Sequence, residues 1–153
     1  MKFLTKISLF FDVFIDKELK KKAPTHAEII RLWCLVQFKR QTNWTMPYPA
    51  LIDTGAHTTI IPKKIWSDLS INKIAKHYVR GLIPKKECKL DIEIGEVEIL
   101  ICDKVKHTNK MKILCYLAPV DNIPLILGFK DLLSKFKICF DYDKNNAYIE
   151  TKR

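Results

Sequence analysis

The amino-acid sequence predicts a mostly β domain, a barrel or a sandwich of many short strands accompanied by one or two short helices. Apolar residues alternate with polar residues along several short segments, which is the side-chain period of a half-buried strand. Turn-forming residues separate these segments, and the sequence has no internal repeat of the length that builds solenoids. Many short strands with turn signals between them are typical of barrels and sandwiches.

Size and composition indicate one globular domain. The chain has 153 residues, of which 48% are hydrophobic and 10% aromatic, so it can bury a real core and wholesale disorder is excluded. Its four glycines and seven prolines exclude low-complexity and fibrous classes. We expect residues 28–153 to form this domain and residues 1–27 to be an N-terminal extension of uncertain structure.

The N-terminal extension contains an apolar stretch, residues 7–15, whose pattern fits both an alternating strand and a helical stripe. Asp12 interrupts this stretch and no small-residue cleavage site follows it, so a strand or helix packed on the domain is favoured over a targeting segment. No run in the sequence reaches the roughly 20 apolar residues that span a bilayer. A membrane-surface role, together with the lysine run at 20–22, is the weaker alternative.

The first predicted elements of the domain lead toward residue 53. Residues 28–38 alternate as a strand, and the prolines at 47 and 49 then predict an extended approach rather than a helix. Residues 50–52 form a short buried strand. Pro62 suits the first turn of a short helix over 63–69.

The second half of the domain is also predicted as short strands. Residues 89–101 alternate apolar and acidic side chains, and Gly95-Glu96 within them predicts a hairpin turn. The remaining expected elements are strands at 111–117 and 125–128, a short helix at 131–136, and a final hairpin of strands 137–142 and 147–151.

The five cysteines form an odd set without a Cys-x-x-Cys pair, which argues against a disulfide framework and a zinc ribbon. Several lie in apolar, strand-like runs, so we expect reduced, buried thiols in a cytoplasmic protein. A cysteine–histidine hydrolase stays open, although no cysteine has the sequence context of a nucleophile. No metal and no cofactor are expected, because the following residues lack metal-ligand spacing: His57, His77, His107, Cys88, Cys102 and Cys115.

The formal net charge of +10 would suit a polyanionic partner. The lysines are scattered along the chain, and neither an aromatic-rich RNA-binding motif nor a recognition-helix pattern accompanies them. A lysine-rich solvated surface is therefore favoured over a nucleic-acid face. A basic β-barrel that binds nucleic acid stays a hypothesis that rests on charge alone.

The tripeptide Asp53-Thr54-Gly55 is the candidate for chemistry. Three apolar residues precede it, Ala56 follows it, and another apolar strand begins just beyond. A carboxylate at the end of a buried strand, followed by a glycine that lets the backbone turn sharply, is an exposed acid on a rigid platform. The structural alternative is a turn aspartate that caps its own backbone.

A second apolar element occurs about 75 residues later, Ile126-Leu127-Gly128, followed by the expected short helix. With Leu51-Ile52-Asp53-Thr54-Gly55-Ala56 before it, this pair of motifs resembles the retroviral-type, or retropepsin-like, aspartic proteases. The resemblance spans roughly residues 29–148. Two motifs in this order and spacing make the match fairly specific, whereas either motif alone would not.

The resemblance implies a small closed acid-protease barrel that works as a homodimer and cuts polypeptides. The implied activity is that of an endopeptidase, a hydrolase in which Asp53 from each copy would form the catalytic dyad. The chain has one Asp-Thr-Gly, and an isologous dimer would bring Asp53 to face its own copy. Two carboxylates about 3 Å apart share one proton, so one activates water while the other protonates the scissile carbonyl.

The resemblance also implies roles for further residues. Thr54, Gly55 and Gly128 would support the catalytic loops. The substrate-binding candidates are Ala56, His57, Gly81, Leu82, Val120 and Ile123. Of these, Gly81 is the candidate tip of a substrate-covering flap that spans residues 74–94, and Val120 and Ile123 would form apolar pocket walls.

The sequence departs from the family pattern in three ways, and two of these departures support an alternative function. The flap segment has few glycines, and His57 stands where retroviral enzymes usually carry an acidic residue. These two departures motivate the alternative of a catalytically silent retropepsin-like module for dimerisation or peptide binding. The long C-terminal hairpin also differs from the retroviral dimer strand, so we expect a differently built dimer interface.

Overall fold

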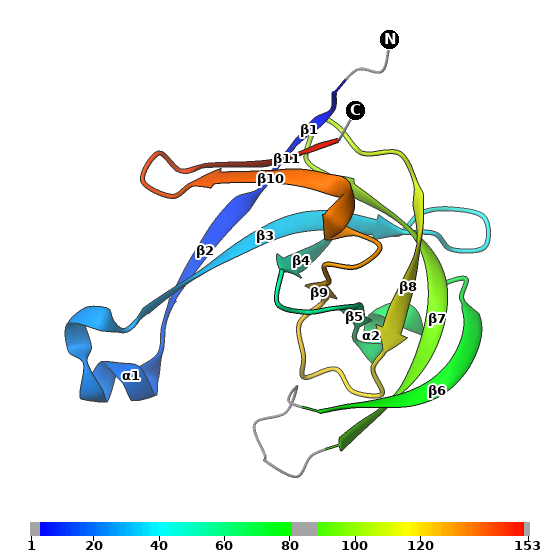
Figure 1. Ribbon diagram of the computed structural model, residues 1–153, viewed down its shortest axis with the longest axis horizontal. Helices are drawn as coiled ribbons and strands as arrows, with labels where there is room; N and C mark the ends of the chain where they lie inside the picture. The colour runs from blue at the N-terminus through cyan, green and yellow to red at the C-terminus, as the bar shows by residue number, and fades with distance from the viewer. Residues whose placement is uncertain (1–3, 81–88, 152–153) are drawn as a thin grey trace.

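The computed structural model describes residues 4–80 and 89–151, and strands dominate it (Figure 1). The strands are β1 Lys6–Ser8, β2 Phe10–Ile15, β3 Glu28–Phe38, β4 Tyr48–Ile52, β5 Thr59–Ile61, β6 Asn72–Arg80, β7 Lys89–Cys102, β8 Met111–Leu117, β9 Ile126–Leu127, β10 Phe136–Asp141 and β11 Asn146–Thr151. The helical elements are α1 Lys17–Lys22, α2 Lys63–Trp66 and the two 3-10 turns η1 Pro24–His26 and η2 Leu133–Lys135. The predicted all-β class with one or two short helices is confirmed.

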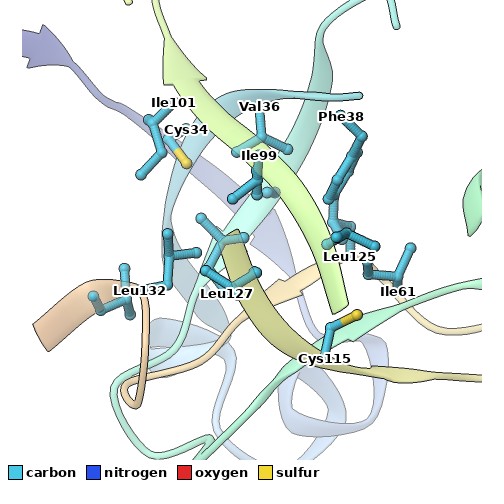
Figure 2. Close-up of a cluster of buried hydrophobic side chains, with 14 of the residues drawn as sticks. Cys34, Val36, Phe38, Ile61, Ile99, Ile101, Cys115, Leu125, Leu127 and Leu132 are labelled. Carbon is cyan, nitrogen blue, oxygen red and sulfur yellow. The ribbon is translucent and has the colours of Figure 1, made fainter. Parts of the chain in front are cut away.

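Eight strands form a sheet that closes on itself. Their order is β2-β3-β4-β9-β5-β8-β7-β6, and β3 also pairs with β7, from Leu35 opposite Cys102 to Phe38 opposite Ile99. A sheet whose strands return to pair with one another is a barrel, as predicted. The core fills its interior, where Cys34, Val36 and Phe38 of β3 meet residues of β7 such as Ile99 (Figure 2).

A second, three-stranded sheet covers the barrel, in the order β1-β11-β10. The β10–β11 pair is the predicted C-terminal hairpin. Ile7 of β1 and Ile149 of β11 are 0% and 1% exposed and belong to the same core as the barrel interior. Both edges of β11 are therefore paired within the chain, with β1 on one side and β10 on the other.

The N-terminal residues, expected as an extension of uncertain structure, form β1 and β2. β1 belongs to the three-stranded sheet, and β2 pairs with the first half of β3. The Asp16 side chain caps α1 by accepting a 2.9 Å hydrogen bond from the Leu19 N–H. We call residues 10–33 the arm: in Figure 1 the blue β2 and the first half of β3 run away from the barrel, with α1 at their far end.

The hairpin turn predicted at Gly95-Glu96 is wrong. β7 runs through this position without a break for 14 residues, with Gly95 opposite Cys115 of β8 and Lys73 of β6. A Cβ at residue 95 would lie 2.7 Å from Cγ2 of Ile71 and 3.2 Å from Cδ1 of Leu117. The glycine serves close packing against these side chains and not a change of chain direction.

Both predicted helices are shorter than expected. α2 covers only Lys63–Trp66 of the predicted 63–69. In the predicted helix 131–136, Asp131 has a φ of 65°, a left-handed conformation that a right-handed helix cannot include. The helical part there is reduced to the single 3-10 turn η2.

Candidate active site

Asp53 follows directly after β4, and the backbone around it is fixed by the neighbouring strand β9. β4 pairs in parallel with β9, with Leu51 opposite Ile126 and Ile52 opposite Leu127. The Asp53 N–H then donates to the Leu127 carbonyl at 3.2 Å. β9 also pairs with β5, so it lies between the strand that enters the Asp53 loop and the strand that leaves it. The loop is thus held at both ends by the same short strand.

The Asp53 carboxylate is oriented by the loop that follows it. Its Oδ1 accepts hydrogen bonds from the backbone N–H groups of Gly55 at 2.9 Å and Ala56 at 3.2 Å. This is the self-capping turn that the structural alternative describes. Within the described residues the other carboxylate oxygen, Oδ2, accepts no hydrogen bond. One oxygen therefore fixes the side chain while the other is left to act on a ligand.

Gly128 joins the second motif to the Asp53 loop. Its N–H donates to the buried Thr59 hydroxyl at 3.0 Å. A Cβ at residue 128 would lie 2.3 Å from the Thr58 carbonyl carbon and 2.5 Å from the Thr59 nitrogen, so only glycine fits against this backbone. The two sequence motifs are therefore in direct contact.

The residues after Gly128 extend this contact along the loop. The Phe129 N–H donates to the Ala56 carbonyl at 2.8 Å, and the Lys130 N–H donates to the His57 carbonyl at 2.9 Å. Thr54, Gly55 and the His57 side chain are exposed. The structure thus brings Asp53, Thr54, Gly55 and Gly128 together in two loops that are joined by backbone hydrogen bonds.

The apolar substrate-binding candidates gather in one cluster beside the loop. Ala56, Val120 and Ile123 pack in a second hydrophobic cluster, separate from the main core. Its other members come from β4, β5, β9, the 116–118 region and the two flap strands β6 and β7: Leu51, Ile60, Val79, Leu90, Ile92, Ile94, Tyr116, Ala118 and Ile126. The Asp53 loop, the predicted pocket wall and the base of the predicted flap therefore pack together in one apolar cluster.

The predicted flap is built on a long antiparallel pair. β6 and β7 run side by side from Asn72 opposite Glu96 to Arg80 opposite Lys89. Gly81, the candidate tip, and Leu82 lie outside the described residues.

Two residues that sequence reasoning missed hold the site in place. Thr59 accepts the Gly128 hydrogen bond, and the only sequence signal was a threonine inside an otherwise apolar strand. Trp66 of α2 donates from Nε1 to the Ala118 carbonyl at 2.7 Å and so anchors the loop that carries Val120. Its sequence neighbourhood offered no signal, because the contact joins residues far apart in the chain.

The buried thiols of Cys34, Cys102 and Cys115 argue against a cysteine nucleophile at these three positions. Burial raises the pKa of Cys34, and it raises the pKa of Cys115 to about 12. The Cys115 thiol donates its proton in a 3.3 Å hydrogen bond to the Gly95 carbonyl. Burial, followed by the nearby Asp103 carboxylate, raises the pKa of Cys102. A thiol must lose its proton to attack, and these three are held in the neutral form.

Other site types find little support in the described ranges 4–80 and 89–151. No group of three or more His, Cys, Asp or Glu side chains there could hold a metal ion. None of the helices described is long and apolar enough to cross a membrane.

Comparison with known proteins gives matches among solved structures only, since no family model and no curated protein matches the chain. A retropepsin-like aspartic protease from Rickettsia conorii is similar over 99% of this chain and 97% of its own, with a TM-score of 0.50 and 12% identity. EIAV protease, in complex with the inhibitor HBY-793, is similar over 68% of this chain and 86% of its own, with a TM-score of 0.40 and 22% identity. The match to the Rickettsia conorii structure, which covers nearly the whole chain, shows that the chain has the retropepsin-like fold.

Proposed function

We propose that the protein is an aspartic endopeptidase that hydrolyses peptide bonds as a homodimer, with Asp53 of each copy forming the dyad. The observation that carries the proposal is the Asp53 carboxylate, one oxygen of which is held by two backbone N–H groups while the other has no partner within the described residues. It lies at the end of the half-buried strand β4 in a retropepsin-like barrel.

The dimer follows from the chemistry of this reaction. One carboxylate must take a proton from the attacking water while a second acid gives a proton to the scissile carbonyl. The chain carries a single Asp-Thr-Gly, so one copy supplies only one of the two acids. An isologous pair meets this need without any further residue, because the same surface of each copy faces the other.

In that pair the two Asp53 carboxylates lie about 3 Å apart and hold one proton between them, because two like charges at that distance cannot both ionise comfortably. The ionised Asp53 acts as general base on a bound water. The protonated Asp53 donates to the scissile carbonyl, and the two exchange roles when the amine leaves. The titration belongs to the dyad as a whole.

The surroundings of Asp53 suggest how a polypeptide would be held. The exposed Thr54 would hydrogen-bond across the dimer, and Gly55 would give the substrate main chain close access. The apolar cluster that contains Ala56, Val120 and Ile123 favours apolar substrate side chains beside the scissile bond. β6 and β7 would form the base of the predicted flap beside the bound chain.

The test compares wild type with Asp53→Asn on a mixed peptide library at mildly acidic pH. An asparagine oxygen still accepts the Gly55 and Ala56 hydrogen bonds, so the variant should fold, but it cannot exchange a proton. Cleavage should fall by about 10²- to 10⁴-fold or more. The matched control is Asp68→Asn, because Asp68 is exposed and makes only a 3.8 Å ion pair with Arg40.

The outcomes separate the two candidate functions. Cleavage that depends on Asp53, survives Asp68→Asn and is blocked by a statine-type inhibitor supports the endopeptidase. Peptide binding without turnover between pH 4 and 8 would identify the silent binding module instead. Equal cleavage by wild type and Asp53→Asn would reject the dyad.

A further inference from the structure

The arm continues the core-facing side of β3 beyond the barrel. Side chains alternate between the two faces of a strand, so Leu32 and Ile30 share the face of Cys34, which is buried in the core. On β2, Phe11 lies opposite Leu32, and Val13 lies opposite Ile30. This inner face of the arm is therefore the same apolar face that the barrel buries.

Only the root of this inner face is covered. Phe11 and Leu32 pack against the main core, and the Phe11 ring meets Tyr142 edge-to-face at 5.1 Å. Farther out, Val13 is 41% exposed and Ile30 is 45% exposed. A two-stranded ribbon with uncovered β-branched residues on its inner face has the character of an interaction surface rather than a solvated one.

The outer face differs in chemistry. It carries Asp12 opposite Arg31, and the Arg31 guanidinium lies 4.7 Å from the centre of the Phe14 ring. Phe10 opposite Trp33 and Phe14 opposite Ile29 complete this outer face, so it is aromatic as well as charged, and Glu28 opposite Ile15 puts one carboxylate on the inner face. Apart from Glu28, the exposed residues of the inner face are the β-branched Val13, Ile15 and Ile30, so this face leaves the larger uncovered aliphatic area.

The position of the arm points to a second copy of this chain. β3 and β4 are antiparallel, with Trp33 opposite Leu51, so the register carried on puts Arg31 level with Asp53. Residues 28–30 and the tip with α1 lie beyond that level, a reach of about 10 Å for the three strand residues at ~3.3 Å each. In Figure 1 the arm leaves the barrel on the side where β4 ends.

In the proposed dimer, an element that projects past Asp53 would extend toward the partner. In an isologous dimer with the two Asp53 residues face to face, the two-fold axis runs beside the Asp53 loop. The C-terminal strand β11 is already paired on both edges within its own chain, so it has no edge left for a strand of the partner. β2, by contrast, is the terminal strand of its sheet and pairs only with β3 among the described residues.

We propose that the inner face of the arm, with Val13, Ile15 and Ile30 at its centre, packs on the partner copy and holds the dimer together. This assignment rests on the proposed dimeric function. Each arm crosses the two-fold axis and packs on the other copy. The exposed apolar residues on the inner face of each arm are thereby buried against the partner. The arm thereby replaces the C-terminal strands as the main dimer contact.

The experiment measures self-association of the full chain by sedimentation velocity over a dilution series. The arm variants are Val13→Glu alone and Val13→Glu with Ile30→Lys, which keeps an opposite-charge pair across the ribbon. The matched control is Val105→Glu, the same substitution at a valine that is 86% exposed in the loop after β7. The dimer dissociation constant should rise at least tenfold in both arm variants and stay unchanged in the control.

A second measurement needs no variant and so does not depend on how a substituted arm folds. Amide hydrogen exchange of the wild type is followed above and below the dissociation midpoint. Residues 10–15 should exchange faster on dilution, because their outer edge and inner face become exposed. Exchange that is independent of concentration in this segment would contradict the assignment.

The outcomes distinguish failure of the arm assignment from failure of the proposed dimeric protease. If the wild type dimerises but the arm variants associate as tightly as Val105→Glu, the arm assignment is overturned and the dimeric protease stands. If the arm variants lose only binding to phosphatidylcholine–phosphatidylserine vesicles, the face serves a membrane surface and the assignment is also overturned. If the wild type stays monomeric while cleaving peptides, the dimeric function falls and takes the arm assignment with it.

Discussion

Replacing Gly128 by alanine tests whether the close contact between the two motifs holds the site together. The new Cβ would lie 2.3, 2.5 and 2.7 Å from three backbone atoms of Thr58 and Thr59. Backbone atoms cannot rotate out of the way as the end of a flexible side chain can. The backbone at Gly128 or at Thr58 and Thr59 must therefore shift. Gly128 carries the 3.0 Å hydrogen bond to Thr59, and that bond would be strained by the same movement.

The change in the free energy of unfolding is the sum of two opposing effects. Overpacking a tight site typically costs about 1–3 kcal/mol and occasionally more. Replacing glycine by alanine also restricts the unfolded chain, which returns about 0.4–1 kcal/mol. Because all three close atoms at Gly128 belong to the backbone, we place the overpacking cost at the upper end of this range and expect a net loss of about 2 kcal/mol or more.

Gly95→Ala is the matched control. The added Cβ would lie 2.7 Å from the Cγ2 methyl of Ile71, a side-chain atom that can rotate away, and 3.2 Å from Cδ1 of Leu117. The gain from the restricted unfolded chain should offset much of this smaller cost, so the net loss should be at most about 1 kcal/mol.

Urea unfolding followed by tryptophan fluorescence measures both variants, at one protomer concentration because dimerisation contributes to apparent stability. The reasoning predicts a clearly larger loss for Gly128→Ala than for Gly95→Ala, accompanied by loss of peptidase activity in the first variant. Equal losses, or a smaller loss at residue 128, would refute it.

Three further predictions follow from the contacts of the site and its surroundings. Thr59→Val keeps the shape but removes the acceptor of the buried Gly128 N–H, so the free energy of unfolding should fall by about 1–3 kcal/mol in urea titrations. Trp66→Phe removes the 2.7 Å bond to Ala118 and should raise KM more than it lowers kcat, because it loosens a pocket loop and leaves Asp53 in place; a change in kcat alone would contradict this. Although burial opposes it, hydrogen bonding by three backbone N–H groups lowers the pKa of Asp103 below its ordinary value of 3.8. The stability that this carboxylate adds is therefore full above pH 3.8 and is lost as pH falls through the lower folded pKa, so the stability gap between wild type and Asp103→Asn should hold at pH 6 and narrow below pH 3.8.

Local pattern was enough to predict the strands and the acid loop. The alternation over residues 28–38 predicted β3 with the same bounds, because a strand with one buried face needs that period and nothing from distant residues. The Asp53 loop was predicted for a similar reason. An apolar strand that ends in Asp-Thr-Gly defines a turn through its own backbone preferences, and the Asp53 carboxylate indeed accepts hydrogen bonds from the N–H groups of Gly55 and Ala56.

Contacts between distant residues decided the rest. Gly95 looks like a turn in sequence, yet Ile71 and Leu117 press against it from other strands and make it part of an unbroken β7. The apolar stretch over residues 7–15 fits a helix and a strand equally well, and only pairing with β3 and β11 selects strands. Sequence alternation also could not place β9 between β4 and β5, because that position depends on closing a barrel through chain segments about 75 residues apart. The amino-acid sequence by itself determined which residues can turn, alternate and ionise, while the tertiary structure decided which of them meet, since packing free energy depends on neighbours that no local window contains.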